Sequence, residues 1–451
     1  MTDGDADRLY PNRGGPADSA GEAAGDRAGV SRRGLLAGSA TAGAALAAGC
    51  SNGSTDGAGG PEAAAGDATE SDSGGEETIF VFNTDDATVS IVDPGRDEVV
   101  DTQHLGLSAS FPSNQYAPEL TTTAADPLWL NVNRGVRALA AGPLSEVAHV
   151  DTGSGSNWQE LAPDGTSVVV SAREPAHANY RIDADRDSET FGEITGEIDR
   201  TDEGGRGDEN GPGPCDVTIH PDGEFAFVPD LFGDTLTVLD VENFEIATQT
   251  DVPAADGADA DGTEDAGGPS KPWMGTVAPS GDRLLVEHQT GTESVWDTSD
   301  PANPDLLAQL TPDDGLGEGA LTSEIGPDSR VGYVFTPGTN DVSVVDIEHR
   351  EVADRIDLGG AAFVGTWGPG HEKLYVPVQT NDEVAVLDHE SREIVARIPV
   401  GSAPYGATAA RVRPETDESA SLLAAMAAVG LDVGEADTTY CIGNCACGHR
   451  L

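Results

Sequence analysis

The amino-acid sequence predicts an all-β protein, a seven-bladed β-propeller built from four-stranded antiparallel blades. Three apolar-alternating runs recur in units along residues 78–413, and such alternation is typical of strands. A fourth run between units ends in a turn such as "APDG" or "HPDG". The units repeat at intervals of roughly 40–50 residues, the length of a propeller blade. The second run of most units ends in aspartate, at Asp93, Asp183, Asp240, Asp297, Asp346 and Asp388.

The spacing of these aspartates sets the number of blades. The interval from Asp93 to Asp183 is about twice the others, so we expect a degenerate unit in "PLWLNVNRGVRALAAGPLSEVAHV". Seven units follow. The first unit has strands at 78–83, 88–93 and 98–105, but the polar segment before it supplies no fourth strand. We therefore predict that residues 404–412 complete the first blade and close the ring, which removes an exposed sheet edge.

The charge of the chain indicates a saline environment and excludes one class of partner. Acidic residues outnumber basic ones by 80 to 24, and the formal net charge is −56. Such an acid excess keeps a surface hydrated where salt screens repulsion. The composition is typical of a halophile; a calcium-loaded surface protein is the alternative interpretation. No basic patch is available to neutralise phosphates, so nucleic-acid binding is excluded.

Residues 1–50 have the features of an export signal, and residues 51–77 those of a tether. Arg32 and Arg33 precede a weakly apolar run that ends at Cys50. This stretch resembles a twin-arginine signal followed by a lipobox, which implies export in the folded state and a lipid on Cys50. The resemblance places the protein on the extracellular face of the membrane. The acidic, Gly/Ser-rich residues 51–77 predict a disordered linker.

The repeats resemble the YVTN family of propeller repeats. The resemblance rests on "FVFN" at Phe80–Asn83, on "LYVP" at Leu374–Pro377, and on "TVSIVD" and "DVSVVD". It implies a seven-bladed propeller of the quinoprotein amine dehydrogenase-like kind. Taken with the export signal and the acid excess, it suggests a lipoprotein of a halophilic archaeon. Two segments, 184–212 and 254–268, exceed the repeat and are predicted to be loops. Asp183, Asp185 and Asp187 begin like a calcium loop, but the later ligand positions do not fit.

A ligand site is expected at the central mouth where the innermost strands begin. Aligned repeats place two columns of residues there: Asn157, Cys215, Trp273, Leu321, Phe363 and Tyr405, then Trp158, Asp216 and Met274. Such aromatic residues suit a flat ligand, and packing between blades is the alternative interpretation. The histidines are scattered, and His220 is the only candidate haem ligand on an inner strand. No hydrolase, zincin or phosphate-loop motif is present, so we expect no catalysis in the propeller.

Residues 414–451 predict a short helix and a cysteine-rich tail. The helix should stop at Gly430 and dock through Leu422, Leu423, Met426 and Val429. The tail contains four spaced ligands for a soft or borderline metal ion, copper or zinc: Cys441, Cys445, Cys447 and His449. A disulfide between two of these cysteines is the alternative in an exported protein. Cys215 is expected to be a buried apolar thiol.

Together these features predict a lipid-anchored extracellular propeller that binds a protein partner or small ligand without catalysis and holds a metal in its tail. Two other functions stay open from the sequence. One is a redox accessory that delivers copper or electrons to a membrane oxidoreductase. The other is a quinoprotein or haem-type propeller oxidoreductase.

Overall fold

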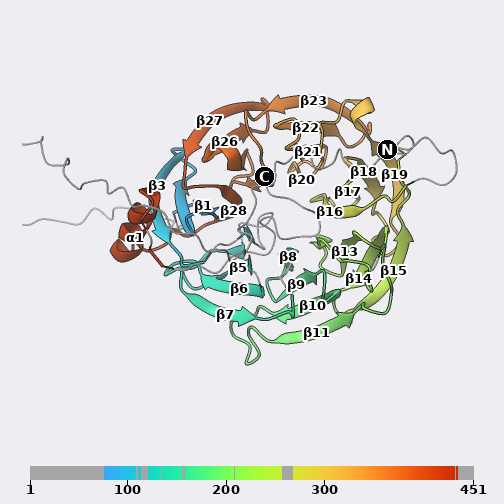
Figure 1. Ribbon diagram of the computed structural model, residues 1–451, viewed down its shortest axis with the longest axis horizontal. Helices are drawn as coiled ribbons and strands as arrows, with labels where there is room; N and C mark the ends of the chain where they lie inside the picture. Colours follow the sequence, from blue (N-terminus) through green and yellow to red (C-terminus); the bar gives the residue numbers. More distant parts are fainter. Residues whose placement is uncertain are drawn as a thin grey trace, which may run out of the picture. The chain divides into compact units, whose positions relative to one another are not determined.

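The propeller has the predicted number of blades. The computed structural model describes residues 76–107, 110–112, 120–132, 134–154, 158–207, 209–255, 268–431 and 433–434. These residues form seven four-stranded antiparallel sheets arranged around a central axis, as Figure 1 shows. The predicted fold class is therefore confirmed.

Each blade is numbered here by the position of its strands along the chain. Blade 1 contains β28 (Pro404–Ala410), β1 (Thr78–Asn83), β2 (Thr88–Asp93) and β3 (Glu98–His104). Blade 2 contains β4 (Ser110–Pro112), β5 (Pro127–Val132), β6 (Gly135–Ala140) and β7 (Glu146–Val150). Blade 3 contains β8 (Trp158–Leu161), β9 (Ser167–Ala172), β10 (Ala178–Asp183) and β11 (Ile194–Asp199). Blade 4 contains β12 (Thr218–Ile219), β13 (Phe225–Asp230), β14 (Thr235–Asp240) and β15 (Glu245–Asp251).

The remaining blades follow the same order from the axis outward. Blade 5 contains β16 (Pro272–Val277), β17 (Arg283–His288), β18 (Glu293–Asp297) and β19 (Asp305–Leu310). Blade 6 contains β20 (Thr322–Ile325), β21 (Val331–Thr336), β22 (Asp341–Asp346) and β23 (Glu351–Asp357). Blade 7 contains β24 (Thr366–Trp367), β25 (Lys373–Val378), β26 (Glu383–Asp388) and β27 (Glu393–Pro399). Short 3-10 turns η3 (Pro312–Asp314) and η4 (Gln379–Asn381) lie in connections.

The ring closes as the sequence predicts, through a strand from near the carboxyl end. β28 pairs antiparallel with β1, so that Ile79 lies opposite Ala409 and Val81 opposite Ala407. Figure 1 shows the two strands side by side at the inner edge of blade 1. These four side chains are fully buried. The pairing joins the two ends of the repeat array, and it covers an edge of β1 that would otherwise be unpaired.

Two predictions for blades 2 and 3, the degenerate unit and the loop over 184–212, have different outcomes. Blade 2 confirms the hidden unit: β5, β6 and β7 lie within the stretch that the spacing of the aspartates singled out. The prediction of a loop over 184–212 is wrong in part, because β11 lies within it and pairs with β10. β11 alternates between exposed and half-buried residues and carries little apolar sequence. An outermost strand needs few apolar residues, because it has a neighbouring strand along only one of its edges.

Each repeated aspartate lies at the end of the third strand of its blade, counted from the axis. It stabilises the turn that leads to the fourth strand. Asp93, Asp240 and Asp388, for example, accept backbone N–H bonds from Gly95 (2.9 Å), Asn243 (2.8 Å) and Ser391 (2.8 Å). An aspartate that bonds the backbone two or three residues ahead stabilises a tight turn. Bonds from the backbone and side chain of Asn243 also hold the pKa of Asp240 below its ordinary value. Part of the acid excess is therefore structural.

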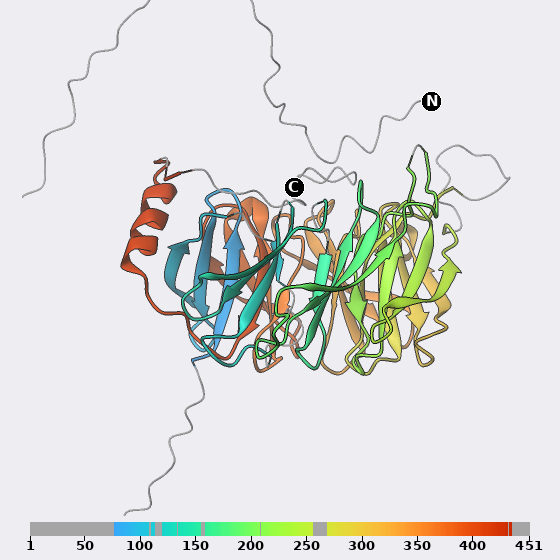
Figure 2. The same cartoon turned by 90° about the horizontal axis from the view of Figure 1, so that it is seen from below.

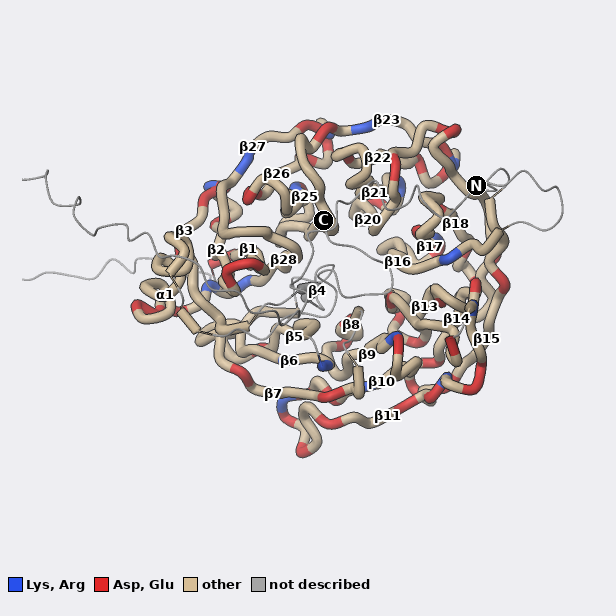
Figure 3. Tube along the Cα trace, in the orientation of Figure 1, with Lys and Arg blue, Asp and Glu red and all other residues tan. Residues whose placement is uncertain are grey.

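The apolar core is divided into layers between neighbouring blades. In one such layer Phe80 and Phe82 of blade 1 pack with Leu128 and Leu130 of blade 2. The first three strands of most blades are almost wholly buried, whereas the outermost strands alternate between exposed and half-buried positions. Acidic residues are spread around the outer strands and the turns of the ring (Figure 3). The acid excess thus lies largely on a surface that water can reach.

The single described helix, α1 (Glu418–Ala428), packs against β3, the outer strand of blade 1 (Figure 2). Asp417 caps its start, and Gly430 ends it with a φ of 76°. The expected docking face is wrong in part. Leu422 and Val429 are 62% and 74% exposed, and the helix buries Ala424 instead. Small residues allow a closer approach to β3. Among the described residues, no helix has the length and apolarity needed to span a bilayer.

Shortening the chain tests the closure of the ring. A chain that ends at residue 403 lacks β28, so we expect it to lose cooperative thermal unfolding and to aggregate, because the inner edge of β1 and its apolar side chains are uncovered. The matched control ends at residue 413. It keeps β28 but lacks α1 and the tail, and it should retain the circular-dichroism melting profile of the full chain. A cooperative transition in the shorter chain would contradict the proposed closure.

Candidate functional site

The inner strands join neighbouring blades around the central axis of the ring, and the space along this axis is called the channel below. Each blade presents the edge of its first strand to the axis (Figure 1). Side chains on these strands reach the next blade's first strand: Val277 N donates to Thr218 Oγ1 (3.2 Å), and Thr276 Oγ1 donates to the Ser323 carbonyl (2.8 Å). In each bond a threonine side chain of one blade reaches the backbone of the following blade, as an acceptor at Thr218 and as a donor at Thr276. These bonds hold the inner strands in register with one another.

Glu160 occupies the same position of the repeat in blade 3 and makes the same kind of bond. Its Oε2 accepts a hydrogen bond from the backbone N–H of Ile219 in blade 4 (3.0 Å). Burial raises the pKa of the Glu160 carboxyl well above its ordinary value; the bond from Ile219 opposes this effect and the charge of Asp216 reinforces it. Sequence reasoning missed this residue, because one glutamate in a chain with 80 acidic residues carries no distinguishing signal.

The predicted mouth residues do come together, as a buried cluster at the end where the inner strands begin. The cluster contains seven of the residues aligned there: Trp158, Cys215, Trp273, Met274, Leu321, Phe363 and Tyr405. All are less than 5% exposed. The rings of Phe363 and Tyr405 lie 4.6 Å apart. This burial favours packing between blades over a ligand platform. Asn157 lies outside the described residues.

Asp216 and Cys215 both serve packing at this end of the channel. Asp216 accepts backbone bonds from Val217 and from Gly275 of the next blade, each at 2.7 Å. Burial raises the pKa of Asp216 well above its ordinary value. Cys215 is a buried thiol within the apolar cluster, as expected, and its sulfur also accepts a hydrogen bond from the Arg173 guanidinium at 3.5 Å. Both residues therefore stabilise the ring.

A second group of buried charges ties the long connection after β11 to blade 4. The Arg200 guanidinium donates two hydrogen bonds to Asp230, at 2.7 and 2.9 Å, and both side chains are fully buried. Arg200 also bonds Glu203 within the connection. A two-bond arginine–carboxylate pair is strong and directional. The sequence did not indicate this pair, because its members lie far apart along the chain.

The other end of the channel contains a cavity of about 320 Å³. Five inner strands contribute to it, and the polar lining residues are Glu160, Trp367 and His371. Its rim carries the prolines of the repeated inter-blade turns: Pro163, Pro221, Pro279 and Pro327. The turns were recognised in the sequence as strand ends, but their convergence at the axis follows only from the closed ring. This cavity, and not the predicted mouth, is the candidate binding site.

Two residues of the lining, Trp367 and His371, carry a nitrogen atom that has no partner among the described residues. Trp367 is 3% exposed, and neither its Nε1 nor the buried Nε2 of His371 has a hydrogen-bond partner among the described residues. A buried donor without a partner costs free energy, so such groups usually meet a ligand or water. None of the described lining residues is lysine or arginine. The cavity therefore combines an apolar wall, a carboxyl group and unsatisfied nitrogen atoms.

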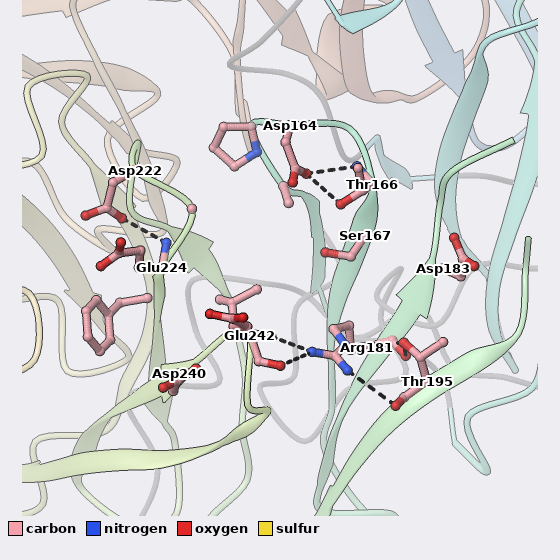
Figure 4. A pocket seen from close by; sticks show the side chains of 15 residues that line it. Asp164, Thr166, Ser167, Arg181, Asp183, Thr195, Asp222, Glu224, Asp240 and Glu242 are labelled. Atoms are coloured by element: carbon pink, nitrogen blue, oxygen red, sulfur yellow. Dashed lines mark hydrogen bonds between the residues drawn. The ribbon is translucent and has the colours of Figure 1, made fainter. Parts of the chain in front are cut away.

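A larger groove, of about 930 Å³, lies between blades 3 and 4 (Figure 4). Arg181 crosses it and donates to the carbonyls of Val241 and Glu242 in blade 4, at 2.7 and 2.6 Å. The aspartates that line the groove accept bonds within their own turns, as where Asp164 accepts the Thr166 N–H at 2.9 Å and Asp222 the Glu224 N–H at 2.9 Å. The groove is thus a seam between blades, with acids that cap turns.

Some of the residues predicted to bind haem or a metal ion lie in the described part of the chain. His220 bonds the Gly281 carbonyl through Nε2 (3.0 Å) and contacts Asp222 through Nδ1 (2.7 Å), so neither ring nitrogen is directed at an open haem site. Asp183 accepts bonds from Ser188 and Thr190. The described residues contain no group of three or more His, Cys, Asp or Glu that could hold a metal ion. Several other predicted residues lie outside the described part: Arg32, Arg33, Cys50, Cys441, Cys445, Cys447 and His449.

Blade 5 buries two glutamates opposite each other. Glu287 on β17 pairs with Glu293 on β18, where blade 1 has the apolar pair Phe82 and Val89. Both glutamates are fully buried, and neither oxygen of Glu293 has a hydrogen-bond partner among the described residues. Burial raises the pKa of Glu287 to about 7. Burial, and then the charge of Glu287, raises the pKa of Glu293 well above its ordinary value.

Substitution of Glu287 tests this pair. A pKa raised from 4.5 to about 7 means that the folded state binds the proton of Glu287 more tightly than the unfolded state does. The contribution of this protonation to the free energy of unfolding is therefore full below pH 4.5 and is lost as pH rises through 7. Glu287→Gln should reduce the loss of unfolding free energy between pH 5 and 8 by on the order of 2 kcal/mol. Denaturant unfolding across this range measures it. The exposed Glu390→Gln is the control, and equal pH profiles for both variants would contradict the assignment.

Comparison with known proteins supports the fold. No protein-family model matches the chain, and no curated protein sequence does. Similar solved structures include a periplasmic gluconolactonase from Pseudomonas aeruginosa, at 16% identity and a TM-score of 0.57, with 74% of this chain and 99% of that chain covered. A putative 6-phosphogluconolactonase from Bacteroides fragilis shares 15% identity, with a TM-score of 0.57 and 76% and 99% coverage. Hydrazine synthase from Kuenenia stuttgartiensis shares 15% identity, with a TM-score of 0.53 and 69% and 92% coverage. At these identities the chain shares with them the fold of a β-propeller.

Proposed function

We propose that the protein is a lipid-anchored extracellular propeller that binds a small ligand in the channel-end cavity and does not convert it. The observation that carries the proposal is the cavity itself: an apolar space on the axis with Glu160, Trp367 and His371 in its wall. A largely apolar pocket with a few convergent polar groups is the usual form of a ligand site. The anchor and the location are proposed from the twin-arginine and lipobox resemblance at Arg32, Arg33 and Cys50.

The chemistry of the lining favours binding over catalysis. The described lining residues include no serine, threonine, cysteine, lysine or tyrosine that would act as a nucleophile. Glu160 and His371 are the two titratable groups, and the Glu160 carboxyl already accepts a backbone hydrogen bond. Lactone hydrolysis, suggested by the names of two similar structures, is therefore not the function proposed here.

A ligand screen tests the binding function. A thermal-shift panel of sugars, lactones, amino acids and ammonium compounds should contain at least one compound that raises the melting temperature of the wild type. Val277→Trp should abolish the shift, because Val277 lines the cavity and the larger side chain fills it. Val395→Trp introduces the same residue at a position 52% exposed on the outer strand β27 and should leave the shift unchanged.

Two results of that screen would contradict the proposal. One is a panel with no stabilising compound, or shifts that Val277→Trp preserves. The other is turnover of a bound lactone at a rate that Glu160→Gln abolishes, because this would show catalysis in the cavity.

The cysteine-rich tail supports a second candidate function, a redox accessory that carries copper to a membrane oxidoreductase. Cys441, Cys445, Cys447 and His449 offer three thiolates and an imidazole within nine residues. This donor set suits Cu(I) or Zn(II), and closely spaced thiolates favour the former. The motif is independent of the channel cavity, so both functions can belong to one protein.

Metal analysis of the exported full-length protein tests the tail. We expect roughly one copper or zinc ion per chain, with tetrahedral or lower coordination. Cys445→Ser should remove the metal, and the buried Cys215→Ser should not, because Cys215 lies in the propeller core. A metal-free protein in which two tail cysteines are resistant to alkylation until reduced would show a disulfide and overturn the metal site.

A further inference from the structure

We infer that the ligand of the channel-end cavity is a small organic cation, an ammonium compound that also carries a hydroxyl or similar hydrogen-bond acceptor. The inference rests on the proposed binding function and specifies the chemical class of its ligand. Three properties of the cavity support it: the charge around it, the nature of its walls, and its unpartnered nitrogen atoms.

The charge around the cavity favours a cation. Glu160 lines it, and Glu324 on β20 is close enough for the Glu160 charge to act on it. Burial, and then the charges of Glu160 and Glu287, raises the pKa of Glu324 well above its ordinary value. The described lining contains no lysine or arginine that would act as a counterion to Glu160. A positively charged ligand beside Glu160 would supply the missing charge and favour the ionised carboxylate.

The walls favour an organic cation over a metal ion. Calcium requires six to eight oxygen ligands, whereas the described lining supplies one carboxylate among aliphatic side chains and proline rings. Leu161, Ile219 and Ile325 suit methyl or methylene groups, and Trp367, whose ring also contacts Tyr333 and His389, is the aromatic residue of the described lining. A volume of 320 Å³ holds roughly ten non-hydrogen atoms at ~30 Å³ for each water-sized group.

The unpartnered nitrogen atoms require an acceptor on the ligand. The indole Nε1–H of Trp367 is a donor only, and it is buried without a partner among the described residues. His371 Nε2, also buried and without a partner there, can donate or accept. A hydroxyl can satisfy either nitrogen, whereas a purely alkyl ammonium ion leaves both unbonded. Choline and ethanolamine combine the required groups within the available volume.

Calorimetric titration of the folded full-length protein with three probes tests the inference. Choline carries the charge and the hydroxyl, 3,3-dimethylbutan-1-ol is its neutral isostere, and tetramethylammonium lacks the hydroxyl. We expect choline to bind at least about tenfold more tightly than either. Glu160→Gln should remove the preference over the neutral isostere. Trp367→Phe keeps an aromatic ring but loses the N–H, so it should reduce the preference over tetramethylammonium.

The exposed neighbour variant Glu372→Gln changes the charge by the same amount outside the described lining and should bind choline as the wild type does. Equal or tighter binding of the neutral isostere overturns the inference but leaves the binding function intact. Failure of all three probes also overturns it. In that case a stabilising compound of another class, whose effect Val277→Trp abolishes, shows that the binding function stands, and the absence of any such compound shows that it fails as well.

Discussion

Closure of the ring is the constraint on which the rest of the structure depends. Each blade buries its two faces against its neighbours, so no blade has a complete core unless every gap in the circle is filled. The pairing of β28 with β1 fills the last gap, and side chains such as Thr218 and Thr276 bond the inner strands of neighbouring blades. The channel, its cavity and its carboxyl groups exist only because these contacts hold the inner strands around one axis.

The two ends of the channel have different chemistry, although the same repeat builds both. At one end the first residues of the inner strands are large and apolar, and they pack into a buried cluster around Trp273, Phe363 and Tyr405. At the other end the inner strands of blades 3 to 6 run into the turns of Pro163, Pro221, Pro279 and Pro327, which line the cavity. The residue types at two positions of the repeat therefore differ between a packed end and an end with a cavity.

Much of the architecture could be predicted from the sequence, because it depends on local patterns that recur. The aspartates at the ends of the strands, such as Asp240 and Asp388, are visible in sequence since each closes its own turn. β11 was missed because an outer strand needs little apolar sequence. The cavity and the pair Glu287–Glu293 were missed for a different reason. Their properties arise from residues in several blades, and nothing in an acidic sequence distinguishes a buried glutamate from an exposed one.

The position of β28 also has a consequence for biosynthesis. Blades 2 to 7 can form in order as the chain leaves the ribosome, because all of their strands are consecutive. Blade 1 cannot, since its inner strand follows all the strands of blade 7 in the chain. A nascent chain must therefore hold an incomplete ring, open beside β1, until β28 has been synthesised. Translocation of a folded protein, as the proposed twin-arginine route provides, would let β28 close the ring before export.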